Sequence, residues 1–263
     1  MDPIPTTTSG EVIEHFAVSM EARRALGRWQ DERPEVAAHV LNHVTRVPYL
    51  TESSQLRNTS MQSVHALGNI AKSEVQGVTA IRDWNPRYAM THVLHYALER
   101  FGTPFTYQQF REFCRDDNRA RAMLTKPSKE AVKASTERYG EKRASDAVRW
   151  RIGNSYYSFM RELVTVVGLR EAGIDLRVHP LADALFRTDA WIGNCVVSLY
   201  IGNATFRDGR SGRKQQPEDL LGGSFRYVSL NLPTQNSFGV LHVPAPATIR
   251  DAAERIRNAT EAA

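Results

Sequence analysis

The segment "RTDAWIGNCVVSLYIGN", from Arg187 to Asn203, limits most what the second half of this chain can fold into. Its pattern predicts two short strands that are joined at Gly193-Asn194 as a hairpin. The first strand carries one acid, Asp189. The second strand, from Cys195 to Ile201, is apolar except for Ser198 and Tyr200. The fold to which this hairpin belongs depends on the elements that flank it.

The flanking pattern from residue 151 to residue 263 alternates helices and strands. A long helix over "SYYSFMRELVTVVGLREAGI" ends near Gly173 and precedes a short strand, "DLRVHP". The hairpin strands "ALFRTDAWIG" and "CVVSLYIG" come next, followed by a short helix, "PEDLLGG". Two further strands, "FRYVSLNLP" and "FGVLHVPAP", precede a closing helix, "TIRDAAERIRNATEA". Strands interleaved with helices predict a mixed sheet that is flanked by helices on both faces.

Residues 1–150 read as a helical part, so the expected fold class is α+β. Residues 1–10 are rich in Pro, Thr and Ser and are expected to be disordered, with Ser9 as a helix cap. Helical spacing runs from Glu11 to about Arg46, and residues 61–72 are a weaker helical segment. Further helices are expected between residues 88 and 139, with a break at Lys126-Pro127 and a cap at Ser128. The helices around "TPFT" (103–106) resemble the start of a helix-turn-helix or winged-helix unit.

The positive charge of the chain is unevenly placed. Residues 100–150 hold twelve Lys and Arg against seven Asp and Glu, which equals the formal excess of +5 for the whole chain. A second cluster, "RDGRSGRK", covers residues 207–214. Basic clusters suit a polyanionic partner such as nucleic acid, although a solvated basic surface gives the same pattern. The candidate nucleic-acid-binding residues are Lys126, Lys129, Lys133, Arg207, Arg210 and Arg213.

Several classes of protein find no support in the sequence. No apolar run is long enough for a membrane span, and neither a phosphate-binding GxxxxGK[ST] motif nor a GxSxG elbow occurs. Only Cys114 and Cys195 are present, far apart, which suits a reducing cytoplasm. His92 and His95 lie three residues apart on a helix, but no third ligand completes a zinc set, so a packing role is favoured.

The order of elements and the acid at Asp189 resemble the core of the PD-(D/E)XK nuclease superfamily, which includes restriction endonucleases and transposon nucleases. The resemblance covers roughly residues 150–260. In this family a helix with an inward Glu precedes a strand and then a Phe-x-x-Asp motif. Here Glu162 lies in the helix, and Asp189 ends the run that starts at Phe186. The implied fold is a restriction-endonuclease-like αβββαβ core.

The resemblance implies phosphodiester cleavage assisted by Mg²⁺ or Mn²⁺, which carboxylates bind through oxygen. Asp189 corresponds to the first acid, but Ser198 and Tyr200 stand where the family has Glu and Lys. Some members replace the strand Glu by Ser and recruit a Glu from the next helix. The corresponding residue here is Glu218, with Asp219 as a neighbouring option. The implied site residues are Asp189, Glu218, Lys214 and Glu162, with Asp189 and Glu218 as metal ligands and Arg213 as an alternative cation.

Simpler interpretations of the same residues stay open. Glu218 begins a helix, where acids are favoured by the helix dipole. Glu162 could pair with Arg151 or Arg187. Asp183 is either a helix cap or a metal ligand, and the cap is favoured.

The function expected from the resemblance is that of a metal-dependent DNA endonuclease, in restriction or mobile-element biology. It would act as a homodimer, with an additional protein partner as an option. The alternative is a non-catalytic DNA-binding pseudo-nuclease or a subunit of a defence or recombination complex. A third class is a small-molecule enzyme on an unrelated α/β fold, which a deep apolar pocket away from Asp189 would favour.

Overall fold

A computed structural model describes residues 5–202 and 216–261 of the chain. The elements of the N-terminal part, up to Tyr139, are β1 (Thr7–Thr8), α1 (Ser9–Phe16), α2 (Met20–Glu32), α3 (Pro34–Leu41), β2 (Val44–Thr45), α4 (Val47–Leu50), α5 (Ser53–Gln62), α6 (Lys72–Val75), α7 (Thr79–Arg82), α8 (Met90–Phe101), α9 (Tyr107–Asp116), α10 (Asn118–Ala120), a π-helical turn η1 (Arg121–Thr125) and α11 (Lys126–Tyr139). The remaining elements are α12 (Glu141–Glu171), α13 (Pro180–Phe186), β3 (Ala190–Ile192), β4 (Cys195–Ile201), α14 (Pro217–Leu221), a 3₁₀ turn η3 (Gly222–Ser224), β5 (Arg226–Leu232), β6 (Asn236–Phe238), β7 (Leu241–Val243) and α15 (Pro246–Glu261).

The largest sheet has the strand order β3-β4-β5. Strand β3 runs antiparallel to β4, and β5 runs parallel to β4. An antiparallel bridge from Arg177 to Trp191 adds a short extended segment beside β3. The sheet therefore receives, in chain order, an extended segment, an antiparallel hairpin and, after α14, a parallel strand. The expected α+β class, with a mainly helical N-terminal part, is confirmed.

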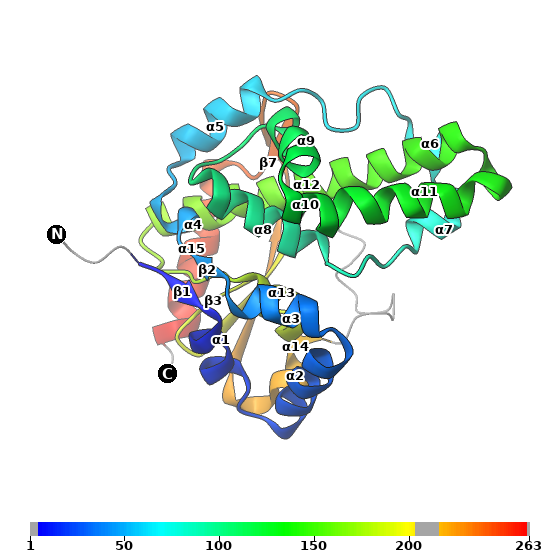
Figure 1. Ribbon diagram of the computed structural model, residues 1–263. Coiled ribbons are helices and arrows are strands. Elements are labelled where there is room, and N and C mark those ends of the chain that lie inside the picture. Colours follow the sequence, from blue (N-terminus) through cyan, green and yellow to red (C-terminus); the bar gives the residue numbers. More distant parts are fainter. Residues whose placement is uncertain (1–4, 203–215, 262–263) are drawn as a thin grey trace.

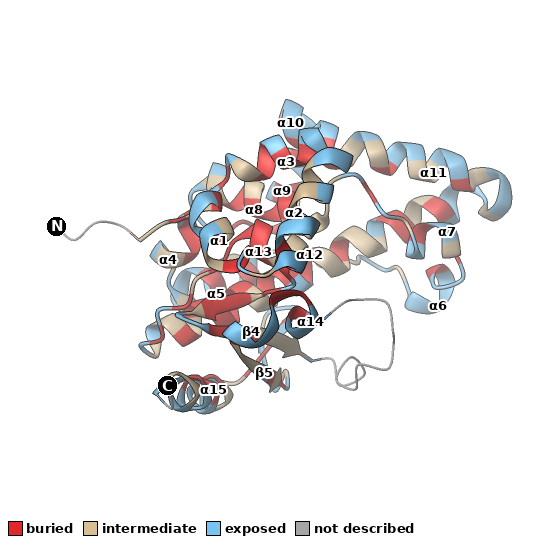
Figure 2. Cartoon of the chain, turned by 90° about the horizontal axis from the view of Figure 1, so that it is seen from below, coloured by how far each residue is buried: buried red, intermediate tan, exposed pale blue. Residues whose placement is uncertain are grey.

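Helix α12 connects the helical part to the sheet. It has 31 residues, which corresponds to about 46 Å at the α-helical rise. Its first half packs along α11 to form an arm that projects from the body (Figure 1), and its second half is lined with buried apolar side chains. Residue 150, the expected domain boundary, lies inside this helix. Exposed residues cover much of α11, whereas the buried residues gather at the centre of the body (Figure 2).

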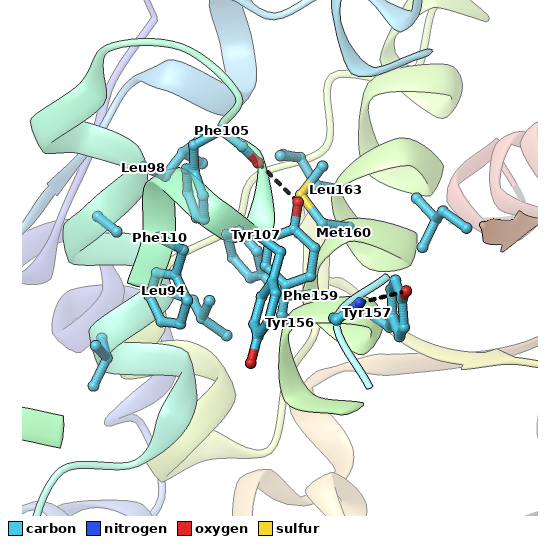
Figure 3. Packing of buried hydrophobic residues seen from close by; sticks show 14 of the residues in the cluster. Leu94, Leu98, Phe105, Tyr107, Phe110, Tyr156, Tyr157, Phe159, Met160 and Leu163 are labelled. Atoms are coloured by element: carbon cyan, nitrogen blue, oxygen red, sulfur yellow. Dashed lines mark hydrogen bonds between the residues drawn. The ribbon is translucent and has the colours of Figure 1, made fainter. Parts of the chain in front are cut away.

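The core of the helical part is built around the aromatic side chains of α12. Tyr156 is buried against Phe105, Tyr107 and Phe110, and its hydroxyl donates to the carbonyl of Phe105 at 2.9 Å (Figure 3). The neighbouring Tyr157 hydroxyl accepts from the backbone N–H of Ala66 at 2.9 Å. Both tyrosines thus bury an apolar ring and give the hydroxyl a hydrogen-bond partner. The partner keeps the free-energy cost of burying the hydroxyl low.

The two faces of the sheet pack against different helices. Cys195, Val197 and Leu230 belong to the cluster formed with α12 and α15. Trp191 and Val196 belong to the cluster formed with α1, α2, α13 and α14. Because side chains alternate along a strand, Ser198 and Tyr200 lie on the same face as Val196.

The N-terminal residues differ from the expectation. Residues 5–10 are not disordered in the structure: Thr7 and Thr8 pair with Thr45 and Val44, and the Thr7 hydroxyl contacts the Tyr49 hydroxyl at 2.6 Å. Thr8, not Ser9, caps α1, in a reciprocal box with Glu11. Ser9 is buried and donates to the carbonyl of Val40 at 2.7 Å. The pairing that orders this segment comes from residues more than thirty positions away, which composition does not reveal.

Other predicted helix boundaries were also wrong. The expected helix over 61–72 is absent: α5 ends at Gln62, and α6 begins only at Lys72. The expected break at Lys126-Pro127 does not occur, because Pro127 lies in the first turn of α11, where its missing N–H costs nothing. Ser128 is therefore inside α11 and not a cap.

The sheet also departs from the expected pattern. Residues 180–186 form α13, so the first hairpin strand is only three residues long. The "DLRVHP" segment contributes a single bridge at Arg177. The last expected strand does not join the main sheet; β6 and β7 form a separate hairpin that packs against α5 and α12. Apolar alternation alone did not determine which strands pair.

Gly153 of α12 lies close to the backbone of the turn at Ala66. A Cβ atom at this position would lie 2.6 Å from the carbonyl oxygen of Ala66. We expect Gly153→Ala to lower the free energy of unfolding by about 1–3 kcal/mol, the usual cost of overpacking, despite the higher helix propensity of Ala. Gly27→Ala in α2 is the matched control, because nothing lies within 4 Å of its Cβ. It should stabilise by up to about 1 kcal/mol. Urea denaturation of both variants measures the difference, and a stabilised Gly153→Ala would contradict the contact.

None of the helices in the described ranges combines the length and apolar composition that crossing a bilayer requires.

Candidate active site

Asp189 is held at the start of β3 by a tight helix exit. Helix α13 ends at Arg187, which adopts a left-handed backbone with φ of 58°, unusual for a residue other than glycine. The next residue, Thr188, is fully buried, and its N–H donates to the carbonyl of Ala182 at 3.0 Å. Asp189 Oδ2 then accepts from the N–H of Leu199 at 2.7 Å. This bond fixes the carboxylate against the middle of β4.

Glu162 lies within electrostatic range of two further carboxylates, those of Asp189 and Asp183. Glu162 comes from α12 and is half-buried, and Asp183 comes from the first turn of α13. Burial raises the pKa of Glu162 well above its usual value, and the charges of Asp189 and Asp183 raise that pKa further. Each negative charge disfavours ionisation of the neighbouring carboxyl group. The arrangement therefore favours either a proton or a cation between these side chains.

The expected cap at Asp183 was wrong, because the side chain of His179 caps α13 by accepting from the N–H of Leu181. The suggested pairing of Glu162 with Arg151 was also wrong. Arg151 donates to the carbonyls of Ile81 and Arg82 instead.

Tyr200 lies within electrostatic range of two acids, Asp189 and Glu218. Burial raises the pKa of Tyr200, and the charges of Asp189 and Glu218 add to that effect. Burial and the charge of Glu218 likewise raise the pKa of Tyr227 on β5. Glu218 is exposed in the first turn of α14, where Asp219 completes a capping box with Gln216. Asp219 thus has a role in helix capping, whereas the charge of Glu218 acts on Tyr200 and Tyr227.

The sheet face beyond these acids is polar and partly open. Ser198 is opposite Ser229 in the parallel register, and Tyr200 is opposite Asn231. Ser229 is exposed, and the other three are partly exposed. The carboxyl end of β4 and β5 therefore presents hydroxyl and amide groups beside the carboxylates, a surface that can hydrogen-bond a polar substrate.

The remaining candidate residues lie elsewhere. Lys126, Lys129 and Lys133 are exposed on α11, in the projecting arm, which packs on α12, η1 and α7. Arg207, Arg210, Arg213 and Lys214 lie outside the described residues, so their roles stay predictions.

Asp189 and Glu162 have the oxygen chemistry that Mg²⁺ prefers. In residues 5–202 and 216–261, no group of three or more His, Cys, Asp or Glu side chains is placed to hold a metal ion. Mg²⁺, however, is commonly bound by one or two carboxylates together with water and substrate phosphates. The donors present fit that kind of site, and they do not fit a cage made only of protein ligands.

Sequence reasoning missed Tyr227 and the contribution of the Leu199 N–H. The alternation in "FRYVSLNL" carried a signal for Tyr227, because it places Tyr227, Ser229 and Asn231 on one face of β5. No sequence pattern indicated the role of the Leu199 N–H, since every residue except proline supplies a backbone N–H.

Comparison of the chain with protein-family models, with curated proteins and with solved structures finds no match.

Proposed function

We propose that this protein is a Mg²⁺-dependent nuclease that hydrolyses phosphodiester bonds in DNA. The observation that carries the proposal is that the carboxylate of Glu162 lies within electrostatic range of both Asp189 and Asp183. The connectivity supports it, since α12, the Arg177 bridge, β3, β4, α14 and β5 follow the order of the αβββαβ nuclease core, with α13 as an additional helix between the Arg177 bridge and β3. The antiparallel hairpin and the parallel fourth strand also agree with that core.

The residues of the chain have distinct roles in this proposal. Asp189 and Glu162 would hold a cation, which would supply positive charge to the scissile phosphate and lower the pKa of a bound water. Because its pKa is raised, Glu162 is suited to accept the proton of the attacking water. Tyr200 keeps its proton beside Asp189 and Glu218, so its hydroxyl can donate to a phosphate or leaving-group oxygen. Glu218 would bind a second cation or a water molecule once substrate is present.

The second candidate is a nuclease-like protein that binds DNA without cutting it. The observation in its favour is that Ser198 and Tyr200 occupy the strand positions at which the resembling family carries Glu and Lys. A hydroxyl is a weak Mg²⁺ ligand, and a tyrosine is not a cation. In this case the charged surface would supply affinity through phosphate contacts.

The test is cleavage of plasmid and linear DNA in Mg²⁺ or Mn²⁺ by the wild type and by Asp189→Asn. Asparagine keeps an acceptor for the Leu199 N–H but removes the charge, so the fold is retained. We expect a loss of at least about 10²-fold in cleavage rate. Asp251→Asn, an exposed residue of α15, is the control and should cut like the wild type. Salt-sensitive binding without cutting by the wild type would select the second candidate, and equal cutting by Asp189→Asn would exclude this site.

A further inference from the structure

The projecting arm contains a groove that the proposed nuclease site does not use. It lies between α9, η1, α11 and α12 and has a volume of about 1190 Å³. Its apolar lining comes from all four elements and includes Phe110, Leu124, Val132, Val148 and Ile152. A concave apolar surface of this size on a thin arm is larger than what packing of the arm requires, and such surfaces mark interaction sites.

The lining of the groove carries charged side chains of both signs. The lining cations are Arg111, Arg115, Lys129, Lys133 and Arg149, and the lining acids are Glu112, Glu137 and Glu141. Arg115 pairs with Asp116, and Arg149 approaches Asp146. Within the described part of the chain, Arg111, Lys129 and Lys133 form no ion pair. Lys129 and Lys133 are one turn apart on α11, so both point to the same side of that helix.

A buried hydroxyl in the same groove points to a missing partner. Ser128 lines the groove and is 9% exposed, and its Oγ has no hydrogen-bond partner among the described residues. A buried hydroxyl without a partner costs free energy that a bound polar group would recover. The π-helical turn η1 also contributes Leu124 and Thr125 to the lining. Such turns are frequent at functional sites.

We propose that this groove binds an acidic, amphipathic helix of a partner protein. Apolar side chains spaced at i, i+3, i+4 and i+7 would cover the apolar lining, and flanking carboxylates would face Arg111, Lys129 and Lys133. Helix α11 is 14 residues long, about 21 Å, which matches four turns of a peptide helix lying alongside. A DNA duplex presents phosphates and not an apolar face, so it would leave the lining of the groove uncovered.

The test uses a fluorescein-labelled peptide of about 18 residues, long enough for a helix to form on binding. It carries Leu at helical spacing on one face and Glu on both flanks. Fluorescence anisotropy measures its affinity for the full-length wild type and for Lys129→Glu/Lys133→Glu. The matched control is Lys126→Glu/Arg138→Glu, which makes the same charge change at exposed positions of the same helix that do not line the groove.

We expect saturable binding to the wild type, at least about tenfold weaker binding to Lys129→Glu/Lys133→Glu, and little change in the control. A peptide with Lys in place of Glu should show the reverse order, preferring Lys129→Glu/Lys133→Glu. The proposal is overturned if the acidic peptide does not bind, or if both double variants lose equal affinity. It is also overturned if a single-stranded oligonucleotide displaces the peptide and responds more strongly to the groove variant, which would assign the groove to nucleic acid. Cleavage of DNA is not measured in this test, so its outcome is separate from that of the nuclease proposal.

Discussion

Glu162→Gln is expected to unfold at a higher temperature than the wild type at pH 8 and, at the same time, to lose DNA cleavage. Burial and the neighbouring carboxylates raise the pKa of Glu162 in the folded chain. An acid whose pKa is raised on folding favours the folded state below its unfolded pKa of about 4.3, and this contribution is lost as the pH rises through the folded value. Glutamine removes the charge, so the wild type should lose stability with rising pH where the variant does not.

The expected gain is about 1 kcal/mol in the free energy of unfolding, or roughly 3 °C in melting temperature for a chain of this size. The loss of cleavage should be at least about 10²-fold. Added Mg²⁺ should raise the melting temperature of the wild type, because a cation relieves the repulsion, and should have less effect on Glu162→Gln. Glu254→Gln on the exposed side of α15 is the control and should change neither property. A destabilised Glu162→Gln with an unchanged response to Mg²⁺ would show that Glu162 is not part of a cation site.

A second large effect is expected from a group of buried histidines. His43, His92, His95 and His179 come from three separate segments and are each less than a tenth exposed. The His43 ring lies 5.1 Å from that of His179 and 5.9 Å from that of His95. Burial lowers the pKa of His43 to about 2, of His92 and His95 to about 3, and of His179 to about 4. These side chains are therefore neutral in the folded protein.

Other charged groups face these histidines and change their pKa values less than burial does. Arg33 lowers the pKa of His92 further, and Glu11 raises that of His179. The adjacent His39, packed against Tyr96, has its pKa lowered to about 4 by burial and by Arg119. Burial is the first cause at every position, so the sign of the pH effect is the same for all.

The chain should therefore unfold on mild acidification. A histidine whose pKa is lowered on folding leaves stability intact above the unfolded value of about 6.5 and reduces it as the pH falls, because only the unfolded chain takes up the proton. Each such group costs about 2 kcal/mol between pH 6.5 and pH 5, and four of them cost about 8 kcal/mol, which is comparable to the whole stability of a typical domain. Urea denaturation at pH 7.5, 6 and 5, followed by circular dichroism, measures this loss.

His92→Leu tests the assignment, because neither ring nitrogen of His92 has a hydrogen-bond partner among the described residues. Its stability at pH 7.5 should equal or exceed that of the wild type, and its loss between pH 6.5 and pH 5 should be smaller by about one proton, or about 2 kcal/mol. His242→Gln, at an exposed position, should leave the pH dependence unchanged. Identical pH dependence in the wild type and in His92→Leu would rule out a role for the histidine group.

Local patterns predicted part of the candidate site. The turn at Gly193-Asn194 and the alternation on either side predicted the hairpin, and β3 and β4 confirm it. The position of Asp189 at the start of β3 follows from the same pattern. The strand length did not, because residues 180–186 became α13 once His179 supplied a cap. A side-chain cap competes with strand formation through a single hydrogen bond, and apolar spacing does not report it.

The sequence by itself determined the helical periodicities, the hairpin and the chemical types available at Asp189, Ser198 and Tyr200, because each depends on neighbours a few residues away. The tertiary structure alone decided that Glu162 lies within electrostatic range of Asp183 and Asp189, that four histidines from distant segments are buried together, and that β7 pairs outside the main sheet. These features depend on how α12 packs against α8, α15, β4 and β7. Such packing is set by the fit of whole surfaces, and one-dimensional spacing along the chain does not specify it.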